Sequence, residues 1–221
     1  MEADYVQRLR MTFKKDGAAR YISHLDLARA LERALNRAKI PVAYTHGFNR
    51  RPRLQMATAL PLGYTSEYEL ADVLLLEEMV PETAQQQLMA KMAPGIDVYK
   101  IETVPVSLPS LQASTVASSY VATPLDPVDV PKLKQKIDDI LASDSLMRQR
   151  TRKGKVREYD LRPLILKLAL HEQAEQLPQI EMSLMLKPSF TGRPDEVLMT
   201  LGFDPLDCRV HRTLIVLQEQ A

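Results

Sequence analysis

Apolar and polar positions alternate near the start of the sequence in the way typical of a half-buried strand. In residues 5–13, Leu9, Met11 and Phe13 share one parity and arginines occupy the other. This alternation predicts a strand with one buried face. Farther along, leucines and alanines recur every three or four positions over 24–39, which predicts an amphipathic helix. Ser23, a good N-cap residue, lies directly before it.

The first half of the chain continues with three more strands and one more helix. We predict strands over 39–45, 68–77 and 96–104, and a helix over 82–92 that begins directly after Pro81. The resulting order, β-α-β-β-α-β, is that of the ferredoxin-like split unit. Residues 1–104 are therefore predicted to form an N-terminal ferredoxin-like unit.

The same order returns after a segment rich in serine and proline. Residues 105–117 contain no charged residue and have the composition of a linker. Beyond this linker we predict a strand over 119–125, a helix over 131–141, a hairpin turning at Lys153-Gly154, a strand over 179–190, a helix over 193–203 and a closing strand over 209–218. Residues 160–172 are ambiguous between strand and helix. The predicted fold is α+β, with tandem ferredoxin-like units at 1–104 and 118–221.

Composition excludes several classes of protein. The 221 residues are 45% apolar and 26% charged, as in an ordinary globular protein. No apolar run approaches the roughly 20 residues that span a bilayer, and the first ten residues lack the apolar region of a secretory signal. The single cysteine, Cys208, excludes a disulfide within the chain and a cluster held by several of its cysteines. We expect a cytoplasmic protein with no membrane partner and no cofactor.

The near-neutral net charge of +1 hides a segregation of charge along the chain. Residues 1–63 hold 12 Lys/Arg against 5 Asp/Glu, and residues 146–168 hold 8 against 2. The stretch 64–104 between them is acidic, with 2 against 8. Because local potential steers a charged partner, two basic blocks on one face would attract a polyanion. The alternative is that each basic block is neutralised by its acidic neighbours.

The start of the first predicted helix is the first candidate site. Ser23, His24 and Asp26 lie at its N-terminus, where backbone amides favour an anion. Arg29, Arg33 and Arg37 follow at intervals of four and form one stripe along the helix. This pattern indicates a phosphate-binding or general acid–base site with His24 as the base. The alternative is a capped helix with a solvated basic face.

The second candidate site is the loop after the strand at 39–45. Arginine donates to phosphate in a bidentate fork, and an aromatic ring stacks on an unpaired base, so the loop has the chemistry of single-stranded RNA recognition. The alternative makes the aromatic residue an ordinary core anchor. The candidate residues are Phe48, Asn49, Arg50, Arg51 and Arg53.

The third candidate site is the predicted hairpin in the second basic block. Its first three arginines alternate, so in a strand their side chains leave the same face and suit a phosphate backbone. The alternative is an edge hairpin that uses charge against aggregation. The candidate residues are Arg148, Arg150, Arg152, Lys153 and Lys155. No metal site is predicted, because the four histidines form no i,i+4 pair.

Four motifs together resemble a known family. They are K-x-G-x-x-x-Y-I-S-H-L-D-L-x-R-x-L-x-R-A-L, I-P-V-A-Y-T-x-G-F-N-x-R-P-R, A-x-P-L-G-Y-T-S-E-x-E-L-A-D-V and R-x-x-K-G-K-V-R-E-Y-D-L-R-P-L-I, which begin at residues 15, 40, 59 and 150. This sequence resembles the radical SAM-linked domain of unknown function, the DUF2344 family. The resemblance implies a radical SAM protein as partner, supplied by a separate chain, and no particular reaction. Arg50 stands where the family has proline, which loosens the loop and adds a charge.

The predicted layout is also similar to that of CRISPR repeat-processing endoribonucleases, although their glycine-rich C-terminal loop is missing here. Three functions follow as hypotheses. In the first, the chain binds an RNA, either tRNA or rRNA, in a basic cleft and presents it to the radical SAM enzyme. In the second, it is a metal-independent endoribonuclease in which His24 is the general base. In the third, it is a protein–protein adaptor of the radical SAM partner.

Overall fold

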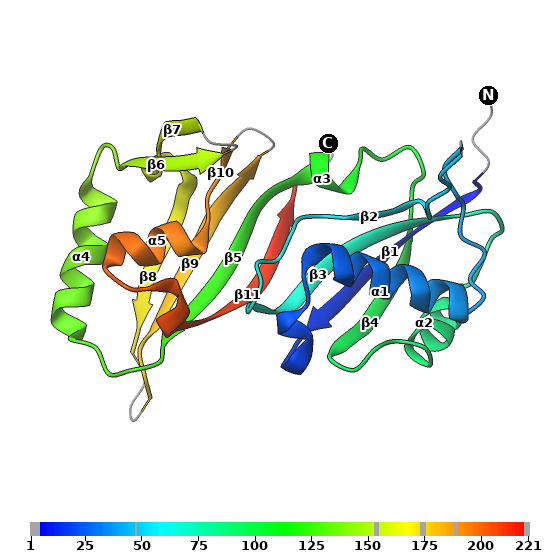
Figure 1. The fold of residues 1–221 in the computed structure, drawn as a ribbon, viewed down its shortest axis with the longest axis horizontal. Helices are drawn as coiled ribbons and strands as arrows, with labels where there is room; N and C mark the ends of the chain where they lie inside the picture. The colour runs from blue at the N-terminus through cyan, green and yellow to red at the C-terminus, as the bar shows by residue number, and fades with distance from the viewer. Residues whose placement is uncertain (1–4, 47, 153–154, 173–175, 188–189, 219–221) are drawn as a thin grey trace. The chain divides into compact units, whose positions relative to one another are not determined.

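The chain folds into two compact units of mixed α+β structure. The computed structural model describes residues 5–46, 48–152, 155–172, 176–187 and 190–218. Unit 1 comprises Met1–Thr115 with Gln218–Ala221, and unit 2 comprises Val116–Leu217. Figure 1 shows the elements of each unit coloured along the chain.

Unit 1 is built on an antiparallel sheet with the order β2-β3-β1-β4. Strand β1 is central and pairs with both β3 and β4. The elements of unit 1 are β1 (Gln7–Lys15), the 3₁₀ helix η1 (Gly17–Tyr21), α1 (His24–Arg37), β2 (Leu54–Met56), β3 (Thr65–Leu75), α2 (Pro81–Met89), β4 (Ile96–Val104) and the short α3 (Leu111–Ser114).

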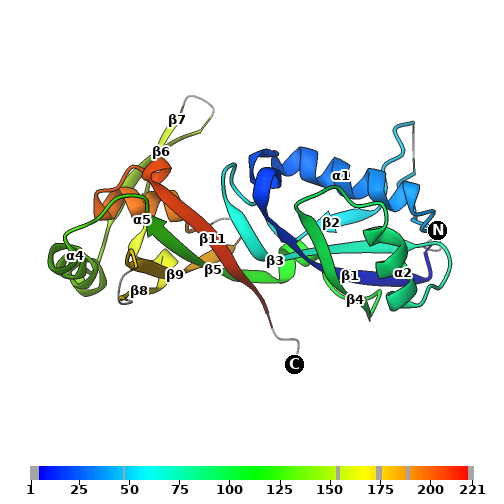
Figure 2. The same ribbon diagram turned by 90° about the horizontal axis from the view of Figure 1, so that it is seen from below.

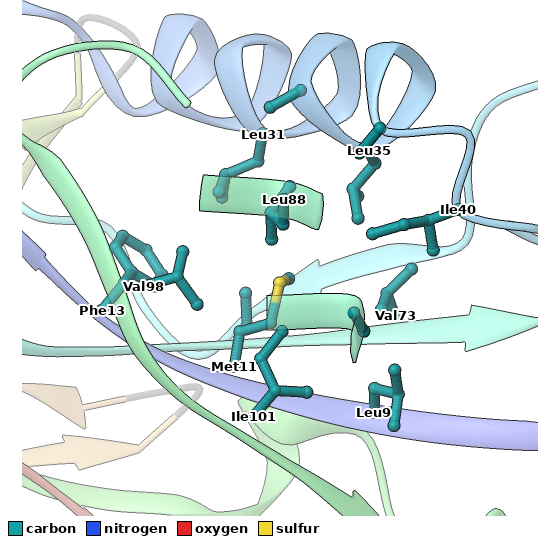
Figure 3. Packing of buried hydrophobic residues seen from close by; sticks show 14 of the residues in the cluster. Leu9, Met11, Phe13, Leu31, Leu35, Ile40, Val73, Leu88, Val98 and Ile101 are labelled. Carbon is teal, nitrogen blue, oxygen red and sulfur yellow. The ribbon is translucent and has the colours of Figure 1, made fainter. Parts of the chain in front are cut away.

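The core of unit 1 lies between one face of this sheet and the helices α1 and α2. Leu9, Met11 and Phe13 of β1 are buried in one cluster with Leu31 of α1 and Leu88 of α2. Figure 3 shows these side chains meeting beneath α1, and Figure 2 shows α1 running above β1 and β3. The period-2 pattern of β1 and the 3.6-period pattern of α1 therefore bury the same interface.

The segment 39–45 differs from the predicted strand. It forms only isolated bridges, Val42 with Leu75 and Tyr44 with Pro52. Pro41 and Pro52 have no N–H to give to a ladder, so pairing is interrupted on both sides. Regular pairing begins only at β2.

Unit 2 contains five strands that pair side by side and a separate two-stranded hairpin. The sheet order is β8-β9-β5-β11, with β10 also on β9. The elements are β5 (Thr115–Pro124), α4 (Val130–Ala142), β6 (Met147–Arg152), β7 (Lys155–Asp160), η2 (Arg162–Leu164), β8 (Ile165–His171), β9 (Gln179–Lys187), β10 (Phe190–Thr191), α5 (Pro194–Leu201), η3 (Pro205–Asp207) and β11 (Cys208–Leu217). Strands β6 and β7 form the separate hairpin.

Two further segments of the sequence contain short elements. The segment 105–117, predicted as a linker, contains α3 and the first residues of β5. The ambiguous segment 160–172 divides into η2 and strand β8. In the part of the chain that the structure describes, no helix is long and apolar enough to cross a membrane.

The α1–sheet interface generates a stability prediction. Leu31 is fully buried, whereas Leu25 on the same helix is 67% exposed. Leu31→Ala should lower the free energy of unfolding by about 2–5 kcal/mol, because it leaves a cavity beneath the helix. The matched control Leu25→Ala should change it by no more than about 0.5 kcal/mol. Urea unfolding followed by circular dichroism measures both, and equal losses would contradict the packing described here.

Candidate nucleic-acid interface

Residues 43–53 form a hairpin whose tip carries the second candidate site. The Arg53 N–H donates to the Ala43 carbonyl at 2.8 Å, and the Thr45 N–H donates to the Arg51 carbonyl at 2.8 Å. The Arg51 N–H donates in turn to Thr45 Oγ1 at 3.0 Å. These bonds fasten the base of the loop, so that Phe48, Asn49 and Arg50 lie at its tip. Gly47 lies outside the described residues.

Phe48 is the most exposed large apolar residue in the described part of the chain. Its relative exposure is 114%, so it is not the core anchor that the alternative interpretation required. Asn49, Arg50 and Arg51 beside it are exposed as well. The tip thus presents one aromatic ring and two guanidinium groups to solvent, with an amide between them.

Arg53 lies at the base of the hairpin rather than at its tip. It is half-buried, and its guanidinium lies over the ring of Tyr5 at 5.3 Å from the centroid. The five loop residues are therefore divided between two environments. Four are exposed at or beside the tip, and Arg53 contacts an aromatic ring below.

At the start of α1 the side chain of Ser23 caps the helix. Ser23 Oγ accepts from the Asp26 N–H at 3.1 Å and donates to Asp26 Oδ2 at 2.7 Å. Arg29 donates to the other Asp26 oxygen at 3.2 Å. These hydrogen bonds lower the pKa of the Asp26 carboxyl, and the bond from Ser23 has the largest effect. The geometry is that of a capped helix with its own carboxylate at the N-terminus.

The remaining residues of this helix have separate environments. His24 is half-buried at the first helical position, and its role as a general base stays a prediction. Arg33 is exposed, and Arg37 donates to the Lys91 carbonyl at 2.6 Å. The stripe of three arginines is thus partly committed to contacts within unit 1.

Two arginines of the β6–β7 hairpin, Arg148 and Arg150, contact side chains of α5. Arg148 donates to Thr200 Oγ1 at 2.6 Å, and Arg150 Nε lies 3.7 Å from Glu196 Oε1. The Arg150 guanidinium also lies over the Tyr159 ring at 4.9 Å. Burial, followed by the charge of Glu196, raises the pKa of Tyr159. Alternation does place Arg148 and Arg150 on one face, as predicted, but α5 supplies their partners.

The turn predicted at Lys153-Gly154 lies outside the described residues. Lys153 is outside the described residues, and so are the side chains of Arg152 and Lys155. Arg157, opposite Arg150 in the strand register, is exposed.

No group of three or more metal-ligating side chains exists among the described residues. Cys208 is a free, buried cysteine, and burial raises the pKa of its thiol to about 11. The thiol is therefore protonated at neutral pH and is a poor nucleophile.

Sequence reasoning missed a buried charge cluster on the opposite face of the unit 1 sheet. Asp72 accepts from Arg8 Nε at 2.9 Å and from Arg10 Nε at 2.8 Å. The Asp72 carboxylate raises the pKa of the Arg10 guanidinium. Arg8 reaches further and donates to the carbonyls of Leu108 and Pro109. The available signal was two arginines on one parity of a buried strand, with an aspartate inside an apolar strand.

The sequence comparison decides the family. Residues 8–194 match the family model described as "Uncharacterized protein conserved in bacteria (DUF2344)". The chain belongs to the DUF2344 family. The matched part of this DUF2344 chain contains the hairpin of residues 43–53, helix α1 and both strands of the β6–β7 hairpin. No curated protein shows significant sequence similarity to it.

Solved structures resemble the DUF2344 chain at the level of the fold. A Cbf5–Nop10–Gar1 complex matches with a TM-score of 0.50 at 8% identity, over 96% of this chain and 50% of that chain. An archaeal box H/ACA sRNP Nop10–Cbf5 complex matches with a TM-score of 0.47 at 8% identity, over 98% and 50%. The DUF2344 chain thus spans about half the length of these solved chains.

The capped start of α1 generates a titration prediction. Ser23→Ala removes the hydroxyl that holds the pKa of Asp26 down, so this pKa should rise toward the ordinary value of an aspartate. A carboxyl with a lowered pKa stabilises the fold above its unfolded pKa and loses that contribution as pH falls through the folded value. The stability advantage of the wild type over Ser23→Ala should therefore be largest at neutral pH and shrink in acid.

Carbon-13 NMR titration of the carboxyl reports the pKa, and thermal unfolding at several pH values reports stability. Ser107→Ala, at an exposed serine, is the control and should alter neither. An Asp26 pKa that does not move in Ser23→Ala would contradict the contact.

Proposed function

We propose that this protein binds single-stranded RNA through the tip of the 43–53 hairpin. The observation that supports the proposal most is the complete exposure of Phe48 beside Arg50 and Arg51. Exposing a phenylalanine forgoes the roughly 1.5–3 kcal/mol gained by burying such a side chain. A ring held out of the core by a fastened hairpin is suited to stack on an unpaired base.

The chemistry of the tip matches both parts of a nucleotide. Bases stack on an aromatic face irrespective of their identity, and arginines donate to the phosphates on either side. Asn49 adds an amide that can donate to or accept from a base edge. We do not include Arg148 and Arg150 in this interface, because Thr200 and Glu196 engage them.

We propose further that the bound RNA is tRNA or rRNA and that a radical SAM enzyme on a separate chain acts on it in the cytoplasm. The family resemblance supports this division of labour. So does the single cysteine, because the ligands of a radical SAM cluster cannot come from this chain.

We also propose that both units are ferredoxin-like. Support comes from the strand orders β2-β3-β1-β4 and β8-β9-β5-β11, each antiparallel where its register is known. In unit 2 the order holds if the β6–β7 hairpin is an insertion between α4 and β8.

The RNA proposal predicts separate effects for the ring and the charges. Fluorescence anisotropy with a 12-nucleotide single-stranded RNA should show Phe48→Ala losing about 1–3 kcal/mol of binding free energy, because one stacked base is lost. Arg50→Gln with Arg51→Gln should reduce the slope of log affinity against log salt by about 1.4, since each phosphate contact contributes about 0.7.

Two exposed residues that do not belong to the 43–53 hairpin provide matched controls. Tyr21→Ala removes an exposed ring of unit 1, and Arg209→Gln removes an exposed arginine of unit 2. Neither should change affinity appreciably. An affinity indifferent to salt, or equal losses from Phe48→Ala and Tyr21→Ala, would reject this function.

The partner proposal predicts a direct contact between proteins. Affinity purification of the tagged chain from its own cells should retrieve a radical SAM protein, identified by mass spectrometry, with and without nuclease treatment. Loss of the partner after nuclease would show that RNA alone links the two. Its absence from both samples would refute the partnership.

A further inference from the structure

A pocket opens on the face of the unit 1 sheet opposite α1 and α2. Its volume is about 150 Å³, and its lining includes Tyr5, Arg8, Arg53, Gln55, Asp72 and Ser110. Register explains why these residues meet. Gln55 lies opposite Asp72 in the β2–β3 pair, and Asp72 lies opposite Arg10 in the β3–β1 pair. The neighbouring residues Ala71 and Val73 point into the core, so Asp72 points away from it.

Positive charge exceeds negative charge around this pocket. One carboxylate, Asp72, is shared by Arg8 and Arg10, whose side chains are 5% and 12% exposed. Glu102 lies opposite Arg10, but its carboxylate is bonded by Lys100 at 2.9 Å. Arg53 adds a further cation. A half-buried excess of cations is costly unless an anion compensates it.

Arg53 is the cation available to a ligand. Its backbone is fixed, since its N–H donates to Ala43 and its carbonyl accepts from the Leu74 N–H at 3.1 Å. Its guanidinium contacts the Tyr5 ring and makes no hydrogen bond or ion pair with another residue that the structure describes. Arg8 is already committed to Asp72, Leu108 and Pro109. The donors of Arg53 therefore line the pocket with the ring of Tyr5 holding them in place.

We propose that this pocket binds a phosphomonoester, with Arg53 as the principal contact and Gln55 and Ser110 as additional hydrogen-bonding groups. The charge selects the class of ligand, because a monoester carries nearly two negative charges at neutral pH and a diester within a strand carries one. The volume points the same way. Pockets for whole drug-sized ligands start at about 300 Å³, so this one has room for a phosphate and little more.

A phosphomonoester can come from the end of an RNA strand or from a free nucleotide. The first source rests on the proposed function: Arg53 lies at the base of the hairpin whose tip carries Phe48, so a strand held at the tip could place its end here. The second source is independent of RNA binding.

The experiment compares three 12-nucleotide RNAs of one sequence, with a 5′-phosphate, a 3′-phosphate or hydroxyls at both ends, and adds AMP as a competitor. At pH 7.5 either the 5′-phosphate or the 3′-phosphate strand should bind about 10-fold more tightly than the strand with hydroxyls at both ends. A gain of this size is typical of a charge-assisted contact. This preference should shrink below about pH 6, where the monoester takes up a proton.

Variants assign the preference to the pocket. Arg53→Gln should abolish it, and Arg53→Lys should restore part of it, because a point charge replaces the bidentate fork. Arg50→Gln should weaken all three strands equally and leave the preference unchanged. Circular dichroism and thermal unfolding establish that each variant is folded.

The outcomes separate this inference from the proposed function. Equal affinity for all three strands, with no competition by AMP, overturns the phosphomonoester site while RNA binding stands. Binding of AMP that depends on Arg53, without binding of any strand, supports the site with a free nucleotide as ligand and rejects the RNA function. A phosphate preference that survives in Arg53→Gln overturns the pocket as its origin.

Discussion

The two faces of strand β1 determine the strand register and the packing of unit 1. One parity of this strand, Leu9, Met11 and Phe13, is buried beneath α1 and α2, and the other parity carries Arg8 and Arg10 to Asp72. Because β1 is central, pairing with β3 and β4 on its two sides, a slip of one residue in register would move arginines into the apolar core. Hydrophobic burial and the buried ion cluster therefore fix the same register. The pocket beside Arg53 is a consequence of that register, since it places Gln55, Asp72 and Arg10 in one row.

Arginines in this protein have different roles according to what tertiary structure places beside them. Arg8 and Arg10 share a carboxylate, Arg148 and Arg150 contact α5, and Arg29 pairs with its own helix. Those of the hairpin tip have solvent around them, and Phe48 shares that exposure. Arginines that contact other groups of the protein contribute to the fold. Exposed arginines next to an exposed ring are available to a polyanion. This contrast, rather than the number of arginines, is the basis for placing RNA at the hairpin of residues 43–53.

Much of the fold was predictable from local patterns. The alternation in β1, the leucine spacing of α1 with its Ser23 cap, and the pairing of β6 with β7 each lie within one short window of sequence. The strand expected at 39–45 was wrong in extent, because the partner strand and two prolines decide which residues pair. The segment 105–117 contains α3, which lies next to β2, a strand far away in the chain. Pairing between distant segments leaves no local signal.

The sequence by itself determined where the cations are, which strands and helices carry them, and that one loop combines Phe48 with arginines. Those facts depend on residue type and spacing, which the chain carries wherever it folds. Only the tertiary structure decided that Phe48 is exposed, that Glu196 and Thr200 meet the β6–β7 hairpin, and that Arg53 lies over Tyr5 beside Asp72. Each of these depends on groups brought together from distant positions. Burial and pairing are properties of that assembly, not of the segment in which a residue lies.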